Sequence, residues 1–193
     1  MKDKPYHDGD LRKKLIEAGI ELINKDGVNN FSLRKVAAMC NVSNAAPYSH
    51  FMSKDELTRA ISDHVTEQFM CSLHTAIEGQ ESSPEIMKLL GNAYISFFMD
   101  NPQYYQFIFY KSRIIIDLNN DNDDDYAPFQ LFKQTAYQMF TSMGMPEERQ
   151  LKTLIALWSL AHGIISLLTN KGVRYSGDWN EILAESFILG RKL

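Results

Sequence analysis

The feature that most constrains the fold is a pair of short helical segments, at about 32–39 and 44–51, separated by a turn at 41–43. Ser32 can cap the first segment, because a serine side chain accepts a hydrogen bond from a free amide at a helix start. Two short helices joined by a three- or four-residue turn form a helix-turn-helix, whose second helix can enter the major groove of DNA. The pattern therefore predicts a small helical domain that fits a DNA duplex.

The segment that follows carries a strong helix-start signal. Ser53 can accept a hydrogen bond from the Glu56 amide while the Glu56 side chain reaches back to the Ser53 amide, which is a capping box. Met52 before the cap and Leu57 after it have the spacing of a hydrophobic staple. We therefore expect a long helix over about 53–77.

Apolar residues recur at helical spacing through the rest of the chain, and no segment reads as a strand. The fold class expected is all-α, with a three-helix N-terminal helix-turn-helix domain followed by a C-terminal helical bundle. The nine helices predicted cover about 10–26, 32–39, 44–51, 53–77, 84–99, 104–110, 128–144, 146–170 and 178–190.

Several side chains of the helix-turn-helix have the chemistry of a DNA contact. Small residues at the start of the second helix let its backbone approach the bases, polar side chains can reach base edges or phosphates, and free amides at helix starts bind phosphate. Any one of these residues taken alone is as well explained by a structural role, and only the set is persuasive. The set consists of Ser32, Arg34, Asn44, Ala45, Ala46, Tyr48, Ser49, His50 and Lys54.

Charge is divided unevenly along the chain. Residues 1–60 hold 10 Lys and Arg against 8 Asp and Glu, a net of +2, and residues 61–193 hold 10 against 16, a net of −6, which together give the −4 of the whole chain. Only the N-terminal part is therefore suited to meet a polyanion.

Pro47 leaves the start of the second helix open. If Ser43 is the N-cap, Pro47 is the fourth helical residue and a hydrogen bond is lost. If Asn44 is the N-cap, Pro47 falls among the amides that have no helical partner, and its cost is small.

From Leu11 to about Ile61 the sequence resembles the TetR family of transcriptional regulators. One set of residues is highly specific for this family. It consists of Tyr48 with His50-Phe51, followed by Ser53-Lys54 and Leu57. The matching stretches are Ala18-Gly19-Ile20-Glu21-Leu22-Ile23, Gly27 to Phe31, Ser32-Leu33-Arg34-Lys35-Val36-Ala37, Val42-Ser43, Tyr48-Ser49-His50-Phe51 and Ser53-Lys54-Asp55-Glu56-Leu57.

The resemblance implies a cytoplasmic, ligand-responsive regulator, usually a repressor, that binds a palindromic operator as a homodimer and is released by a small molecule. It implies that residues 1–52 bind DNA, that the helix from 53 connects, and that 53–193 bind the effector and dimerise. By position, Tyr48, His50 and Lys54 match DNA-contacting residues of the family. Asn44, Ala45 and Ala46 match the start of the recognition helix, and Ser32 and Arg34 match phosphate contacts.

The leader Tyr6 to Arg12, and Trp158 with His162-Gly163, resemble one branch of this family with a WHG-like C-terminal effector domain. Aromatic residues with polar ends suit a ligand pocket, although a packed core needs the same residues. The predicted ligand-binding residues are Tyr94, Phe97, Phe98, Tyr104, Phe107, Trp158 and His162.

Residues 153–170 contain no charged side chain, a length at the edge of a membrane span. Polar residues interrupt the segment, which favours burial between elements or subunits over a membrane. Packing of the helices at 146–170 and 178–190 against those of a second chain would bury it, and the resemblance implies this homodimer interface.

No enzyme motif or cofactor site is recognisable, and none is predicted. His64, Glu67, Cys71 and His74 share a helix face, but about 15 Å separates the first from the last, so we expect a solvated face and no metal site. The two cysteines fit a reducing cytosol. The alternatives are a helical small-molecule-binding or catalytic protein whose helix hairpin is purely structural, and a membrane-associated protein built on 153–170.

Overall fold

The computed structural model describes residues 8–81, 83–110, 112, 114–118, 126–170, 172–179 and 181–182. These residues contain no strand, so the all-helical prediction is confirmed. Seven α-helices and one 3₁₀ helix follow one another in the order α1 (Asp8–Asp26), α2 (Leu33–Met39), η1 (Ala46–Ser49), α3 (Lys54–Ile77), α4 (Ile86–Asp100), α5 (Pro102–Tyr110), α6 (Ala127–Ser142) and α7 (Glu147–Leu168).

The prediction of nine α-helices is wrong, because the described residues form seven. The third predicted helix is the four-residue 3₁₀ helix η1, with Pro47 at one of its first two positions. Just before it, the Ala46 amide donates to the Ser43 carbonyl at 3.0 Å. The ninth predicted helix, at 178–190, lies largely outside the described residues, whereas only the first two residues of the leader at 6–12 do.

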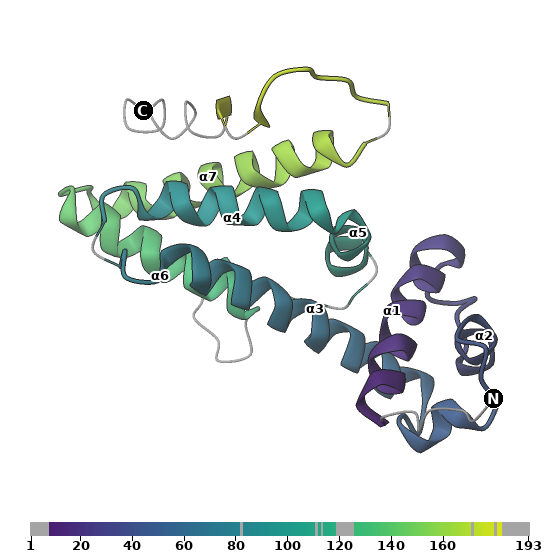
Figure 1. Ribbon diagram of the computed structural model, residues 1–193. Coiled ribbons are helices and arrows are strands. Elements are labelled where there is room, and N and C mark those ends of the chain that lie inside the picture. Colours follow the sequence, from purple (N-terminus) through teal and green to yellow (C-terminus); the bar gives the residue numbers. More distant parts are fainter. Residues whose placement is uncertain are drawn as a thin grey trace. The chain divides into compact units, whose positions relative to one another are not determined.

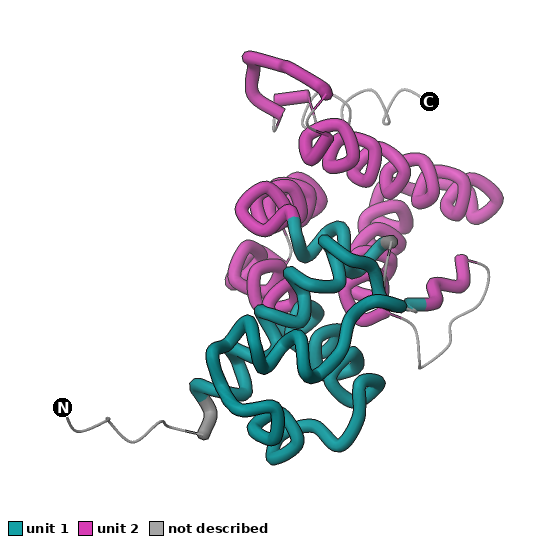
Figure 2. Tube along the Cα trace, turned by 90° about the vertical axis from the view of Figure 1, so that its right-hand side faces the viewer, with its two compact units in different colours: residues 1–67, 103–114 teal, residues 68–102, 115–193 magenta. Residues whose placement is uncertain are grey.

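The chain divides into two compact units, residues 1–67 with 103–114 and residues 68–102 with 115–193 (Figure 2). Unit 1 contains α1, α2, η1, the first part of α3 and nearly all of α5. Unit 2 contains the end of α3, α4, α6 and α7.

Unit 1 is built on the packing of α1 against α2 and of α2 against η1 (Figure 1). Gly19 allows a close approach within this unit, since a Cβ atom there would lie 2.7 Å from a side-chain carbon of Ile61 on α3. The side chains that are almost fully buried in its core include Leu15, Ile16, Ile20, Ile23, Phe31, Val36, Phe51, Leu57 and Ile61.

A defined turn carries the chain from α2 to η1. Asn41 has φ of 54°, a left-handed conformation that asparagine tolerates better than most residues. The Val42 amide donates to the Ala37 carbonyl and the Asn41 amide to the Ala38 carbonyl, as in a Schellman motif. This turn fixes where η1 emerges from the core.

In unit 2, α4 packs against both α6 and α7, which also pack against each other; Figure 1 shows α4 running alongside α7. Within the part of the chain described, α7 is the helix whose length and apolar composition are sufficient to cross a membrane. Only 22% of its most apolar stretch is buried inside the chain. The rest of this stretch is half-buried or exposed, and Leu167 is its one exposed large apolar residue among those described.

Candidate functional site

The predicted DNA-contacting residues of η1 lie on the outside of unit 1. Tyr48 is 55% exposed, whereas Pro47 beside it is buried and holds the 3₁₀ helix to the core. His50 is half-buried, and its ring lies 6.3 Å from that of the buried Phe51. Exposed Asn44, Ala45, Tyr48 and Ser49 therefore form one short, mostly polar surface.

The start of η1 resolves the alternatives for Pro47. Ala45, and neither Ser43 nor Asn44, stands at the N-cap, and Pro47 occupies one of the first two helical positions. A missing amide there removes no helical hydrogen bond, so proline is accommodated. The Ser49 hydroxyl donates to the Ala46 carbonyl at 2.7 Å, which closes the short helix.

The helix starts on either side of η1 are capped as predicted, with one difference. The Ser32 hydroxyl accepts from the Lys35 amide at 3.3 Å, and the Ser53 hydroxyl accepts from the Glu56 amide at 3.1 Å. The Glu56 carboxylate, however, accepts from the Met52 amide at 2.6 Å and not from Ser53. The predicted staple is wrong, because the Met52 side chain is 85% exposed.

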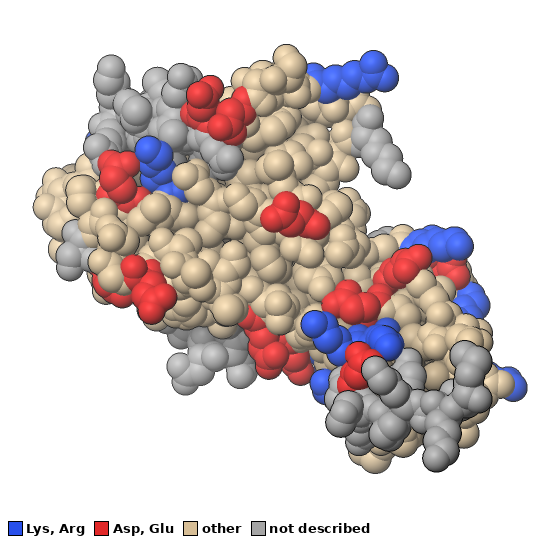
Figure 3. Space-filling view, in the orientation of Figure 1, with Lys and Arg blue, Asp and Glu red and all other residues tan. Residues whose placement is uncertain are grey.

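Cations flank this surface. Lys54 Nζ lies 5.8 Å from the centroid of the buried Phe31 ring, a cation–π distance that positions the ammonium group at the start of α3. Arg34 is exposed on α2. Arg12, which the sequence reasoning did not select, lies with its Cζ 5.3 Å from the Phe51 ring centroid. Figure 3 shows that Lys and Arg of unit 1 stand among Asp and Glu on the face drawn, at its lower right.

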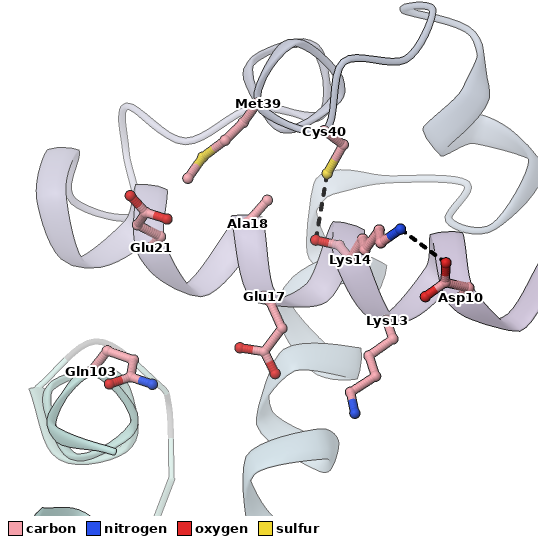
Figure 4. A pocket seen from close by; sticks show the side chains of 9 residues that line it. All are labelled: Asp10, Lys13, Lys14, Glu17, Ala18, Glu21, Met39, Cys40 and Gln103. Carbon is pink, nitrogen blue, oxygen red and sulfur yellow. Dashed lines mark hydrogen bonds and ion pairs between the residues drawn. The ribbon is translucent and has the colours of Figure 1, made fainter. Parts of the chain in front are cut away.

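An open hollow of about 900 Å³ lies elsewhere in unit 1 (Figure 4). Lys14 Nζ pairs with Asp10 at 2.9 Å on its rim, so cations and anions are mixed there. Cys40 Sγ donates to the Lys14 carbonyl at 3.4 Å, and burial raises the pKa of its thiol. The hollow is lined by Asp10, Lys13, Lys14, Glu17, Ala18, Glu21, Met39, Cys40 and Gln103.

Five of the predicted ligand-binding residues form one aromatic cluster in unit 2. The Tyr94 hydroxyl lies 3.2 Å from His162 Nδ1, and their rings stack with centroids 5.5 Å apart. The Trp158 ring lies 4.7 Å from that of His162. Phe97 and Phe98 join the cluster through their own contact at 5.0 Å and through Tyr94, which lies 5.1 Å from Phe98.

Two further rings belong to this cluster and were not selected from the sequence. Phe69, in the second half of α3, lies 5.5 Å from Tyr94 and 5.1 Å from Phe97. Phe129, near the start of α6, lies 4.6 Å from Trp158. The only sequence feature that marks these two residues is their position in the apolar pattern of a helix. Residues of an ordinary packed core have the same position.

His162 is neutral at pH 7. Burial lowers the pKa of its imidazole to about 4, and a hydrogen bond with the Trp158 backbone offsets only part of this effect. The cluster therefore offers rings, a hydroxyl and a neutral imidazole, and the charge that an ionic ligand requires must come from another residue.

Tyr104 and Phe107 lie in unit 1 and not with these five residues. The Tyr104 hydroxyl donates to Glu17 at 2.7 Å, and burial together with this carboxylate holds the pKa of the phenol above its usual range. His64, expected on a solvated face, donates from Nε2 to Glu17 at 3.0 Å, with its side chain only 14% exposed. Phe107 is fully buried.

A helix-turn-helix with a polar outer surface, carried on an otherwise helical chain, defines a DNA-binding regulator. Residues 15–61 match the family model of bacterial regulatory proteins, tetR family, and residues 87–187 match the tetracyclin repressor-like C-terminal domain. The second match alone covers more than half of the chain, which belongs to the TetR family. Ligand-responsive repression is typical of this family, and the chain is a transcriptional regulator and not an enzyme.

Individual relatives agree with this assignment. The chain is 38% identical over 72 residues to the nicotine-responsive transcriptional repressor HdnoR of Paenarthrobacter nicotinovorans, a match that covers 37% of each protein. A protein of unknown function from Rhodococcus sp. RHA1 superposes with a TM-score of 0.73 at 23% identity, covering 99% of both chains. A tetR-family regulatory protein from Rhodococcus RHA1 gives 0.68 at 18% identity, covering 93% of this chain and 94% of that one. At these identities the structural likeness concerns the fold.

Proposed function

We propose that the protein is a cytoplasmic repressor that binds a palindromic DNA operator as a homodimer and is released by a small molecule. The observation that carries the proposal is the exposed polar surface of η1, held between two capped helix starts. The functional division is the one expected from the sequence, with residues 1–52 binding DNA and 53–193 binding effector and dimerising.

Base reading is assigned to η1. Exposed Tyr48 and Asn44 reach base edges or phosphates, and the small side chains of Ala45 and Ala46 let the backbone come close. Ser49 and His50 complete this contact surface.

Phosphate binding is assigned to the flanking helix starts. Ser32 and Arg34 bind phosphates on one side of η1, at the start of α2. Lys54 binds phosphates on the other side, at the start of α3. Arg12 adds a further cation close to Phe51. These contacts set the register of the protein on the duplex and make its affinity depend on salt.

The dimer interface is assigned to α7 and the helix predicted at 178–190. The incomplete burial of the apolar helix α7 within the chain supports this assignment, since exposed apolar surface often marks an interface. Leu167 is 47% exposed, and Ile155 and Leu160 on the same helix are only half-buried. A dimer also places two copies of η1 about one turn of DNA apart, which a palindrome requires.

The effector site is assigned to the aromatic cluster of Tyr94, Phe97, Phe98, Trp158 and His162, and Tyr104 and Phe107 remain predicted members of the ligand-binding set. Effector must bind the conformation that does not fit the operator more tightly than the one that does, because a ligand without this difference shifts no equilibrium.

Selection of bound duplexes from a random pool tests the proposal. The wild type should enrich a palindrome with a Kd of roughly 10⁻⁸–10⁻¹¹ M that weakens steeply with salt. Lys54→Ala should bind the same palindrome at least about tenfold more weakly, since a desolvated phosphate contact is lost. Lys25→Ala, an exposed lysine of α1, serves as the matched control.

Enrichment of no sequence by the folded protein, or equal binding by Lys54→Ala, would contradict the proposal. It would favour a helical small-molecule-binding protein whose hairpin is structural. A non-palindromic motif would refute the symmetric dimer while leaving DNA binding intact.

A further inference from the structure

One carboxylate of unit 1 is contacted by two buried side chains. The Tyr104 hydroxyl of α5 donates to Glu17 Oε1 at 2.7 Å, and His64 Nε2 of α3 lies 3.0 Å from the same oxygen. The rings of Tyr104 and His64 also meet edge to face, with their centroids 6.2 Å apart. Hydrogen bonds to a charged group are stronger than those between neutral groups, so Glu17 joins three helices firmly at one point.

The two side chains that contact Glu17 lie beside the places where the chain passes between the units. Unit 1 stops at Glu67 within α3, three residues after His64, and resumes at Gln103, immediately before Tyr104. A further bond joins α1 to α5, since the Asn24 side-chain amide donates to the Gln103 carbonyl at 2.7 Å. α1 is therefore bonded both to the helix that leaves unit 1 and to the helix that returns to it.

α1 also contacts the elements that carry the proposed DNA contacts. Arg12 lies five residues before Glu17, which is about 8 Å along the helix axis. Its Cζ is 5.3 Å from the ring centroid of Phe51, which follows η1 in the chain. α1 packs against α2, and α2 packs against η1. The position of α1 therefore bears on the position of η1.

We propose that Glu17 is a positioning residue for operator binding and that Tyr104 of α5 acts through it. The inference rests on the proposed function, because it takes the surface of η1 as the DNA contact. Glu17 itself binds no DNA: it holds α1, and with it Arg12 and η1, in the geometry that fits the duplex. Recognition then requires His64 and Tyr104, which lie outside the residues 1–52 assigned to DNA.

Operator affinity tests the inference, with the duplex that the wild type selects. Tyr104→Phe removes one hydroxyl and keeps the buried ring. It should bind this duplex at least about fivefold more weakly, which is within the factor of about ten that a hydrogen bond to a charged group contributes. Ser112→Ala is the matched control, because the Ser112 hydroxyl in the same segment of unit 1 donates to the Ile108 carbonyl and not to α1. Its affinity should equal that of the wild type.

Three further variants assign the effect to Glu17. Glu17→Leu offers no acceptor and should weaken binding at least as much as Tyr104→Phe. The double variant should bind no more weakly than Glu17→Leu, because the hydroxyl has already lost its partner. Glu17→Gln keeps an oxygen acceptor and should lose less affinity than Glu17→Leu. A purely structural role would leave operator affinity unchanged in every variant that thermal unfolding shows to be folded.

Amide hydrogen exchange reports the position of α1 without DNA. Loss of the bond to Glu17 should make local opening of α1 easier, so Tyr104→Phe should raise exchange in α1 at least about fivefold. Exchange in α6, which belongs to unit 2, should not change. Ser112→Ala should leave α1 as slow as in the wild type.

Wild-type or tighter operator binding by Tyr104→Phe would overturn the inference. An equal loss of affinity in Ser112→Ala, a further loss in the double variant, or unchanged exchange in α1 would also overturn it. A wild type that selects no operator would remove the proposed function, and this inference with it. An operator that the wild type and Tyr104→Phe bind equally well would remove this inference alone.

Discussion

The Tyr104 hydroxyl on α5 donates a 2.7 Å hydrogen bond to the Glu17 carboxylate on α1. His64 on α3 donates to the same oxygen atom at 3.0 Å, so three helices of unit 1 meet at one carboxylate. α5 follows α4 after Asn101, and α4 carries Tyr94 of the aromatic cluster. The helix that follows α4 in the chain is therefore bonded directly to α1 within unit 1.

Removing the Tyr104 hydroxyl should weaken unit 1. We expect Tyr104→Phe to lower the free energy of unfolding by about 1.5 kcal/mol, at the low end for a hydrogen bond to a charged group because Glu17 is partly exposed and keeps His64. Urea unfolding measures the change. In a Glu17→Gln background the same substitution should cost clearly less, and equal costs in both backgrounds would show that the two groups are not coupled.

Stability should depend on pH through His162. Its pKa is about 4 in the folded chain and about 6.5 when unfolded, so the unfolded chain binds more protons between these values. The free energy of unfolding should therefore fall as the pH is lowered from 7 to 4, with His162 contributing about 3 kcal/mol. Chemical unfolding across this range should give a shallower decline for His162→Gln, whereas parallel curves would contradict the assignment.

The cap of α3 should contribute measurably to stability. The Ser53 hydroxyl accepts from the Glu56 amide, so Ser53→Ala is expected to cost about 1 kcal/mol. Ser96→Ala, at an exposed position on α4, should change the free energy of unfolding by less than about 0.5 kcal/mol. A Ser53→Ala variant as stable as Ser96→Ala would show that the cap contributes nothing.

The two cysteines should differ in reactivity. Cys71 is exposed, whereas Cys40 is partly buried, and burial raises its pKa and lowers its thiolate fraction. With iodoacetamide at pH 8, peptide mass spectrometry should find Cys71 alkylated at least about tenfold faster than Cys40. In urea the two rates should converge, and a faster Cys40 in the folded protein would contradict the burial described for it.

Local hydrogen bonds could be predicted from the sequence, and long-range contacts could not. The Ser53 cap follows from a serine with a glutamate three positions later, within four consecutive residues, and it is present. The predicted staple between Met52 and Leu57 is absent. The Met52 amide donates to the Glu56 carboxylate, and the Met52 side chain stays in solvent. The apolar pattern predicted an α-helix over about 44–51, whereas the structure has the four-residue 3₁₀ helix η1 there.

The sites show the same division. The outward position of Tyr48 follows from the family pattern of the helix-turn-helix, whereas the partner of Tyr104 lies 87 residues away in the sequence. Aromatic spacing does not distinguish a residue that bonds to Glu17 from one that joins His162. The burial of Lys133 results from the packing of α6 against α4 and α7. A lysine in a helical segment of the sequence does not by itself indicate such burial.

Because unit 1 is assembled from residues 1–67 and 103–114, an N-terminal fragment that ends before α5 lacks part of it. Recombination that exchanged only the first stretch would replace Glu17 opposite Tyr104 and would also replace Asn24, whose side-chain amide donates to the Gln103 carbonyl at 2.7 Å. A chimera that keeps the new operator specificity must carry the nine residues of α5 from the same parent. The helix-turn-helix unit thus depends on a helix that lies far from it in the sequence.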